Sequence, residues 1–270
     1  KNTSENKTLV SPKDIKCKDR MFSPSKYTSI RMMLQNDTEF MTAFAAAIKR
    51  LENTKKAAKK LSLYLINPES CHKLNSDIDE SILSLTMMLD REYNSFKQTR
   101  NDNELRTDLM ATLMLATHIP SLRLSHLLQQ FKNEGGETEQ PILYLTIKNF
   151  CEKHDKQHKE TLDTLFSHGI QFSQIEASDK FKPTLTTQSS SSTILGQSVI
   201  QVGENIKKHP ELLEHIKIGV FIYQNQMVAE NNRGLSAFVV SEAPLRHAKL
   251  RLIGVAPTQL ILNAYIEKLS

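Results

Sequence analysis

Glycine is scarce in this sequence, with 8 residues among 270, and tryptophan is absent. Only Gly135, Gly136 and Gly169 fall within the first 180 residues. Because glycine destabilises helix interiors, its scarcity there favours helical structure. The lack of tryptophan and the aromatic content of 6% leave few side chains that could stack on nucleic-acid bases. Nucleic acid is therefore a less favoured partner than protein.

Long apolar runs are also missing. The stretch from Ile216 to Tyr223 is among the longest, and Lys217 and Gly219 interrupt it. A helix that crosses a bilayer needs about 18 or more apolar residues, so we predict no transmembrane segment. The opening of the chain, from Lys1, has no apolar core like that of a signal peptide. We therefore expect a fragment or a processed product.

Cysteine occurs three times, at Cys17, Cys71 and Cys151. The odd number and the wide spacing argue against a disulfide framework and favour a reducing compartment, so we expect a cytoplasmic protein. Three glycosylation sequons would suit a secreted chain instead, at Asn2, Asn6 and Asn36. A sequence rich in Asn and Thr produces such triplets by chance, and the cytoplasmic interpretation is preferred.

Several short enzyme signatures are missing as well. The sequence has no phosphate loop of the form GxxxxGK[ST], no GxGxxG after a strand, no GxSxG elbow and no HExxH helix. These absences argue against the common nucleotide-binding and hydrolase folds, and no cofactor is expected.

Amphipathic helices dominate what the sequence does contain. Apolar residues recur at spacings of three and four residues in five segments, which is the period of a helix with one buried face. These segments run from Asp37 to Pro68, from Ser76 to Phe96, from Asn103 to Ile119, from Leu124 to Phe131 and from Pro141 to Gly169. Such stripes can be buried only against one another, so the sequence predicts a helical bundle.

Local signals set the expected ends of these helices. Asp37 is a predicted N-cap, and Ser76 with Asp79 three residues later has the pattern of a capping box. Pro120 is expected to end the third helix, because proline lacks the N–H that continues the hydrogen-bond ladder. Gly135 and Gly136 are expected to close the fourth helix.

The composition changes after residue 170, and the sequence therefore predicts a mainly α fold with a smaller C-terminal mixed α/β or helical unit. The expected organisation is a flexible arm over 1–24, the bundle over 25–170, a polar Ser/Thr-rich linker or loop over 171–193, and the C-terminal unit over 194–270. Candidate strands are Ile216 to Tyr223, Ala237 to Ser241 and Lys249 to Val255, followed by a helix from Pro257 to Leu269. A helix from Glu211 to Ala229 is the alternative.

A candidate metal site lies on the fifth predicted helix. Cys151, His154 and His158 are spaced so that all three side chains share one helix face. A thiolate and two imidazoles are ligands that zinc prefers, and His168 or a neighbouring helix could supply the fourth ligand. The sequence has no second ligand cluster of the zinc-finger type, so a polar end of the bundle is the preferred interpretation.

Cys71 and His72 are the candidate cysteine nucleophile and base. They are adjacent in the sequence, in a predicted loop before the second helix. A nucleophile and its base usually come from distant parts of a chain, so an ordinary loop thiol is the preferred interpretation.

The formal net charge is +5, from 35 Lys and Arg against 30 Asp and Glu. Part of the excess lies on the first predicted helix, at Lys49, Arg50, Lys55, Lys56, Lys59 and Lys60. A solvated face is preferred for these residues, and binding of acidic headgroups, phosphates or an acidic protein partner is the alternative.

The sequence therefore predicts a non-catalytic helical interaction module, and its expected partner is another protein. One alternative is peripheral binding of anionic membrane lipid through the lysine-rich helix. The other is an enzyme of unrecognised fold with its site near His209, His215 or His247. A deep pocket that gathers titratable side chains would favour this last alternative.

Overall fold

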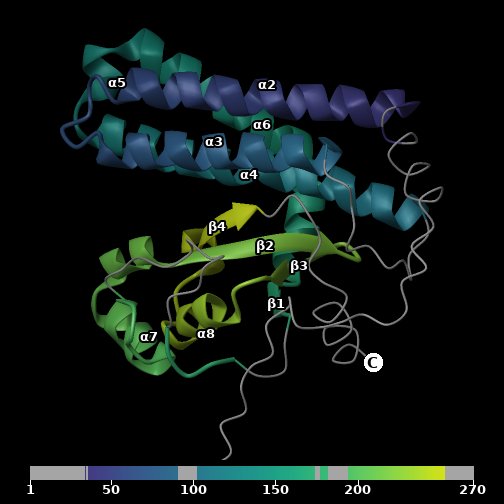
Figure 1. Cartoon of the computed structure of the whole chain (residues 1–270). Coiled ribbons are helices and arrows are strands. Elements are labelled where there is room, and N and C mark those ends of the chain that lie inside the picture. The colour runs from purple at the N-terminus through teal and green to yellow at the C-terminus, as the bar shows by residue number, and fades with distance from the viewer. Residues whose placement is uncertain (1–33, 35, 91–101, 174–176, 182–193, 253–270) are drawn as a thin grey trace, which may run out of the picture.

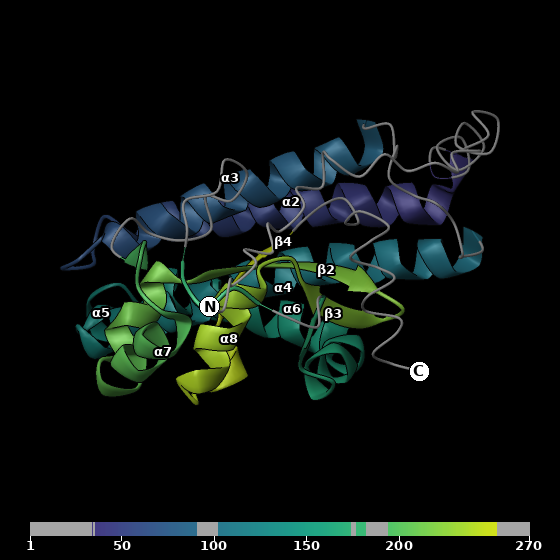
Figure 2. The same ribbon diagram turned by 60° about the horizontal axis from the view of Figure 1, so that its bottom comes forward.

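The computed structural model describes residues 34, 36–90, 102–173, 177–181 and 194–252. In this part of the chain a bundle of long helices lies on one side of a four-stranded sheet, and two shorter helices lie on the other side (Figures 1 and 2). The molecule is mainly α, as the sequence predicts, and the strands of the described residues lie between Ile170 and Leu252. In the described ranges, no helix combines the length and the apolar composition that a bilayer span requires.

The first long helix is α2, Thr38–Leu61. Its N-cap is Asp37, whose carboxylate accepts a hydrogen bond of 2.9 Å from the backbone N–H of Phe40. One face of α2 is buried, at Phe40, Ala47, Leu51, Thr54, Ala58 and Leu61. The predicted cap and the predicted apolar stripe are both confirmed.

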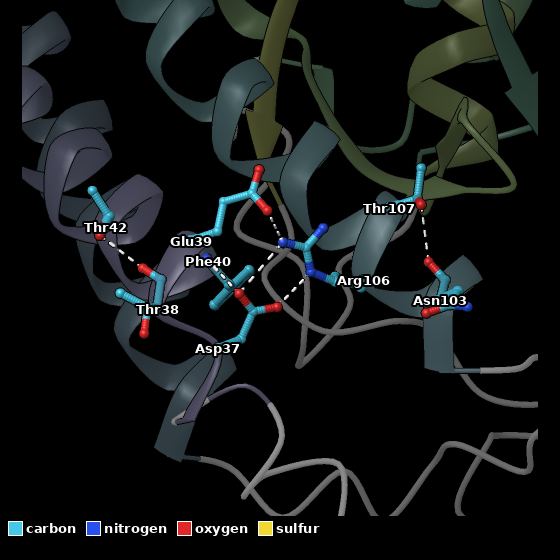
Figure 3. Close-up of polar contacts among 8 residues, drawn as sticks. All are labelled: Asp37, Thr38, Glu39, Phe40, Thr42, Asn103, Arg106 and Thr107. Carbon is cyan, nitrogen blue, oxygen red and sulfur yellow. Dashed lines mark hydrogen bonds and ion pairs between the residues drawn. The ribbon is translucent and has the colours of Figure 1, made fainter.

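The other helices of the bundle are α3 (Glu69–Asp90), α4 (Asp102–Asn133), α5 (Gly136–Glu139) and α6 (Pro141–Ser167). The guanidinium of Arg106, on α4, contacts the carboxylate of Asp37 and binds that of Glu39 at 2.6 Å (Figure 3). The residue that caps α2 therefore also joins α2 to α4.

The second helix begins at Glu69 rather than at Ser76, so the predicted capping box lies inside α3 and that prediction is wrong. The carbonyl of Pro68 accepts hydrogen bonds from the backbone N–H groups of Cys71 (2.9 Å) and His72 (3.2 Å). Proline is well suited to a helix start, where an N–H would have no partner, and an acidic residue in the first turn is also favourable.

The third and fourth predicted helices form one continuous helix, α4, which contains Pro120. The prediction that Pro120 ends a helix is wrong. Proline inside a helix costs about 3 kcal/mol, whereas burial of one leucine side chain contributes about 1.5–3 kcal/mol. Buried leucines lie on both sides of Pro120, at Leu113, Leu115, Leu124 and Leu128. The packing of α4 against α2 and α6 explains why the helix continues.

The fifth predicted helix is confirmed as α6. Pro141 occupies its first turn, and the chain leaves the helix at Gly169, which has a positive φ of 66°.

The sheet contains β1 (Ile170–Phe172), β2 (Lys217–Tyr223), β3 (Gln226–Ala229) and β4 (Lys249–Leu252) in the order β1-β3-β2-β4. The central strands β2 and β3 form an antiparallel hairpin, and the two edge strands pair in parallel with it. All residues of β2 after Lys217 are buried, because helices cover both faces of the sheet.

The helices on the far side are α7 (Val199–Lys208) and α8 (Asn232–Val240), which pack against each other. The predicted strand Ala237–Ser241 is wrong, because this segment mostly lies in α8. The side chain of Asn231 accepts a hydrogen bond of 3.1 Å from the N–H of Gly234 and starts that helix. A cap and a buried helical face therefore outweigh the β propensity of Phe238, Val239 and Val240.

The strand predictions that begin at Ile216 and Lys249 are confirmed within the described residues. The alternative helix over residues 211–229 is wrong, because this range holds all but the first residue of the short helix η2 (Pro210–His215), then β2 and β3. The predicted arm over 1–24 and the predicted helix from Pro257 lie outside the described residues.

One buried carboxylate joins the bundle to the sheet. The turn between β2 and β3 contains Gln224 and Asn225, both with positive φ, at 49° and 58°. Their backbone N–H groups donate hydrogen bonds of 2.8 and 2.9 Å to the carboxylate of Asp108, on α4. Asp108 is only 4% exposed. This contact fixes the hairpin turn to the N-terminal part of α4.

Candidate functional site

A cleft of about 410 Å³ lies where the bundle meets the C-terminal unit. Helices α3 and α4 line one side of it, and η2, the short helix η3 (Leu245–His247) and β4 line the other. The apolar part of its lining consists mainly of Leu74, Ile119, Leu122, Leu127, Leu213 and Leu245. The sequence predicts the stripes on α3 and α4, but only the fold shows that η2 and η3 complete a cavity with them.

Asp77, on α3, anchors the charged rim of the cleft. The guanidinium of Arg123 contacts its carboxylate, and the ammonium of Lys217 lies 2.9 Å from it. Arg123 also donates a hydrogen bond of 3.3 Å to the backbone carbonyl of Leu250. Residues from α3, α4, β2 and β4 therefore meet at this point.

Glu214, in η2, is a second anchor. Lys73 donates a hydrogen bond of 2.8 Å to its carboxylate, and the ammonium of Lys249 lies 4.0 Å away. The hydrogen bond from Lys73 is the main reason why the pKa of Glu214 is lowered. Burial lowers the pKa of Lys249, and the nearby Glu214 opposes that effect. Acidic and basic groups are therefore paired at the rim.

The histidines named for the enzyme alternative lie in three different positions. His247 lines the cleft and is exposed. The ring of His209 lies 3.4 Å from the carboxylate of Glu211, outside the apolar lining. His215 is half-buried at the end of η2. The structure therefore brings only His247 of these three into the cleft.

The lysine-rich set on α2 divides into two groups. Lys49, Lys56, Lys59 and Lys60 are exposed. The other two members contact neighbouring helices: Lys55 binds Asp79 of α3 at 2.6 Å, and Arg50 contacts His158 of α6. An external partner could therefore reach the four exposed lysines while the contacts of Lys55 and Arg50 with neighbouring helices stay intact.

The candidate metal residues lie on α6, with Cys151 and His154 buried and His158 half-buried. The rings of His154 and His158 are 5.4 Å apart. Two residues that the spacing did not indicate lie close to His154 alone of this set: His118 of α4, whose ring is 6.5 Å from that of His154, and Asp155. His118 could not be found from sequence, because its nearness to α6 depends on how the two helices pack. His168 is exposed at the C-cap of α6.

Cys71 lies in the first turns of α3 rather than in a loop, and its side chain is buried. Burial raises the pKa of the thiol to about 11. His72 is exposed on a different side of the same helix. A protonated, buried thiol is a poor nucleophile, so this geometry argues against the cysteine nucleophile.

The fold and the site together define a mainly α-helical protein with a small mixed sheet and an amphipathic cleft at the junction of the two. No protein-family model matches the chain, and no match was found to it among the curated proteins or the solved structures.

Proposed function

We propose that this protein is a non-catalytic interaction module that binds a segment of another protein in the cleft between the bundle and the C-terminal unit. The observation that carries the proposal is the combination of the apolar lining of the cleft with a rim of acidic and basic groups. Its volume of about 410 Å³ lies within the usual range of ligand sites.

The chemistry of the lining favours a protein segment as the ligand. Leu122 and Leu245 are only half-buried, so an apolar side chain of a partner could remove their remaining surface from water. The rim presents carboxylates, at Asp77 and Glu214, beside cations. Apolar anchors surrounded by charges of both signs are typical of protein interfaces.

The ion pairs of the two rim carboxylates argue against a role of either one as a general base. A general base works best when its pKa is near neutral. The pKa of Glu214 is instead lowered by the hydrogen bond from Lys73. Asp77 is held by Arg123 and Lys217. These carboxylates are therefore arranged as structural ion pairs.

The proposal is tested by selecting peptides from a displayed random library on the full chain and measuring their affinity by fluorescence polarisation. We expect Leu122→Arg to weaken binding of the selected peptides at least tenfold, because a guanidinium would then lie in the apolar lining of the cleft. Leu83→Arg is the matched control, since Leu83 is 60% exposed on α3 and does not line the cleft. Peptides that bind Leu122→Arg as well as the parent chain would contradict the proposal.

The exposed lysines of α2 favour a second candidate function, which is peripheral binding of anionic lipid. A lysine near an anionic membrane contributes about 1 kcal/mol. Reversal of Lys56, Lys59 and Lys60 to Glu is therefore expected to reduce co-sedimentation with phosphatidylserine vesicles by at least about a hundredfold at low salt.

The matched control is reversal of three exposed lysines of α6, Lys153, Lys156 and Lys159. Vesicles of phosphatidylcholine alone test the dependence on lipid charge. Binding that ignores lipid charge, or that falls equally in both triple variants, would eliminate this candidate.

A further inference from the structure

Three metal-ligating side chains meet between α4 and α6: His118, His154 and Asp155. One potential ligand atom from each lies within 4.8 Å of the others. His118 comes from the second half of α4, and the other two are neighbours on α6. Packing of α4 against α6 therefore creates the group.

These side chains have buried polar atoms without hydrogen-bond partners among the residues that the structure describes. His154 is 3% exposed, and neither of its ring nitrogens has a partner. Nδ1 of His118 and Oδ1 of Asp155 are also buried and have no hydrogen-bond partner there. Buried polar atoms are nearly always satisfied in folded proteins, so four such atoms in one place require an explanation.

We propose that His118, His154 and Asp155 bind a divalent transition-metal ion of the zinc class. Imidazole nitrogens and a carboxylate oxygen are the donors of many zinc sites with three protein ligands. An ion placed among them would supply a partner to three of the four atoms, one from each side chain.

The observed separations fit this assignment. Nδ1 of His118 lies 3.8 Å from Oδ1 of Asp155, and Nδ1 of His154 lies 3.9 Å from the same oxygen. Ligand atoms around tetrahedral zinc are about 3.3 Å apart, given bonds of about 2.0–2.1 Å. Small rotations of the side chains would therefore complete the site.

The site also has access to solvent. The side chain of Asp155 is 45% exposed, whereas those of His118 and His154 are 12% and 2% exposed. An ion can enter from the Asp155 side, and water can complete its coordination there. Three protein ligands with one open position is the arrangement of a zinc ion that keeps a bound water.

Two residues of the set predicted from spacing are not assigned as ligands. Cys151 is not among the side chains whose potential ligand atoms lie within 4.8 Å of one another, so we do not assign it as a ligand. Nε2 of His158 contacts the guanidinium of Arg50. That contact occupies Nε2 of His158, and His158 is not in the group of side chains whose ligand atoms gather here.

The test uses the full chain, freed of metal by a chelator and titrated with Co²⁺ by absorption spectroscopy, followed by competition with Zn²⁺. We expect one equivalent of metal per chain. His118→Gln and His154→Gln are each expected to weaken binding at least a hundredfold, and Asp155→Asn at least tenfold. Far-ultraviolet circular dichroism checks that each variant is folded. Zn²⁺ should raise the melting temperature of the parent chain more than that of Asp155→Asn, whose side chain keeps nearly the same shape.

Cys151→Ser and His158→Gln are the control variants, and we expect both to bind within threefold of the parent chain. A thiolate-to-cobalt absorption band, or binding lost in Cys151→Ser but kept in His118→Gln, would overturn the assignment. Binding of less than a tenth of an equivalent by the folded parent chain would overturn the metal site itself.

Discussion

Asp37 has two partners at the start of α2. Its carboxylate accepts a hydrogen bond from the N–H of Phe40 and also contacts Arg106 of α4 (Figure 3). Arg106 is the main reason why the pKa of Asp37 lies below its ordinary value of 3.8. A carboxyl whose pKa is lowered by folding stabilises the folded state above its unfolded pKa, and this stabilisation is lost as the pH falls through the folded pKa.

We therefore expect Asp37→Asn to lower the melting temperature at pH 7 and to have no effect in strong acid. Asparagine is an equally good N-cap, so the variant removes the charge and keeps the cap. Thermal denaturation monitored by circular dichroism between pH 2 and 7 measures the difference. A difference that stays constant down to the lowest pH would show that the ion pair with Arg106 is not responsible.

Asp108 carries a second prediction at this scale. It is buried, and it accepts two backbone hydrogen bonds from the hairpin turn. A hydrogen bond to a charged group contributes about 1.5–3 kcal/mol. Asp108→Ala is expected to lower the free energy of unfolding in urea by about 2–4 kcal/mol. Asp163→Ala, at an exposed position of α6, is the control, and equal effects of the two substitutions would contradict the prediction.

At the scale of elements, α7 and α8 approach closely at Gly203. A Cβ atom at this position would lie 2.5 Å from Cβ of Val240 and 2.8 Å from the carbonyl oxygen of Ala237. The backbone contact cannot be relieved by rotating a side chain. Overpacking of this kind costs about 1–3 kcal/mol.

Gly203→Ala is therefore expected to reduce the free energy of unfolding by about 1–3 kcal/mol, although alanine is the better helix former. Ile200→Ala, on the exposed face of α7, is the control, because Ile200 is 68% exposed. Equilibrium denaturation in urea provides the measurement. Stabilisation by Gly203→Ala would show that the two helices separate at little cost.

The helices could be predicted from sequence where apolar residues repeat along a single face. The stripe of α2 and the cap at Asp37 are local features, and they appear in the structure as expected. The start of α3 was missed because Pro68 acts through its carbonyl, which the sequence pattern does not show. Pro120 was misread because the packing on both sides of it, rather than its own chemistry, determines the course of α4.

The candidate sites depend more strongly on tertiary structure. His154 and His158 could be placed on one face from their spacing, but His118 comes close to His154 only through the packing of α4 on α6. In the same way, Lys73 and Glu214 are 141 positions apart and meet only where η2 lies beside α3. The sequence shows which chemical groups such residues carry, whereas the packing of the elements determines which of them meet.

At the scale of the whole molecule, the sheet covers apolar surface of the bundle. Strand β2 packs on α4, and β4 packs on both α3 and α4. A shortened chain that ends at Gly169 would expose this surface to water. We expect that fragment to self-associate, with a larger apparent mass in analytical ultracentrifugation than the full chain. A monomeric, fully helical fragment would contradict this prediction.

The Asp108 contact also sets an order for synthesis on the ribosome. Asp108 precedes its partner Gln224 by 116 positions, so the carboxylate leaves the exit tunnel long before the hairpin has been translated. We expect the nascent helices to assemble before the hairpin can dock on Asp108. The hydrogen bonds from the hairpin turn to Asp108 would then form late in folding.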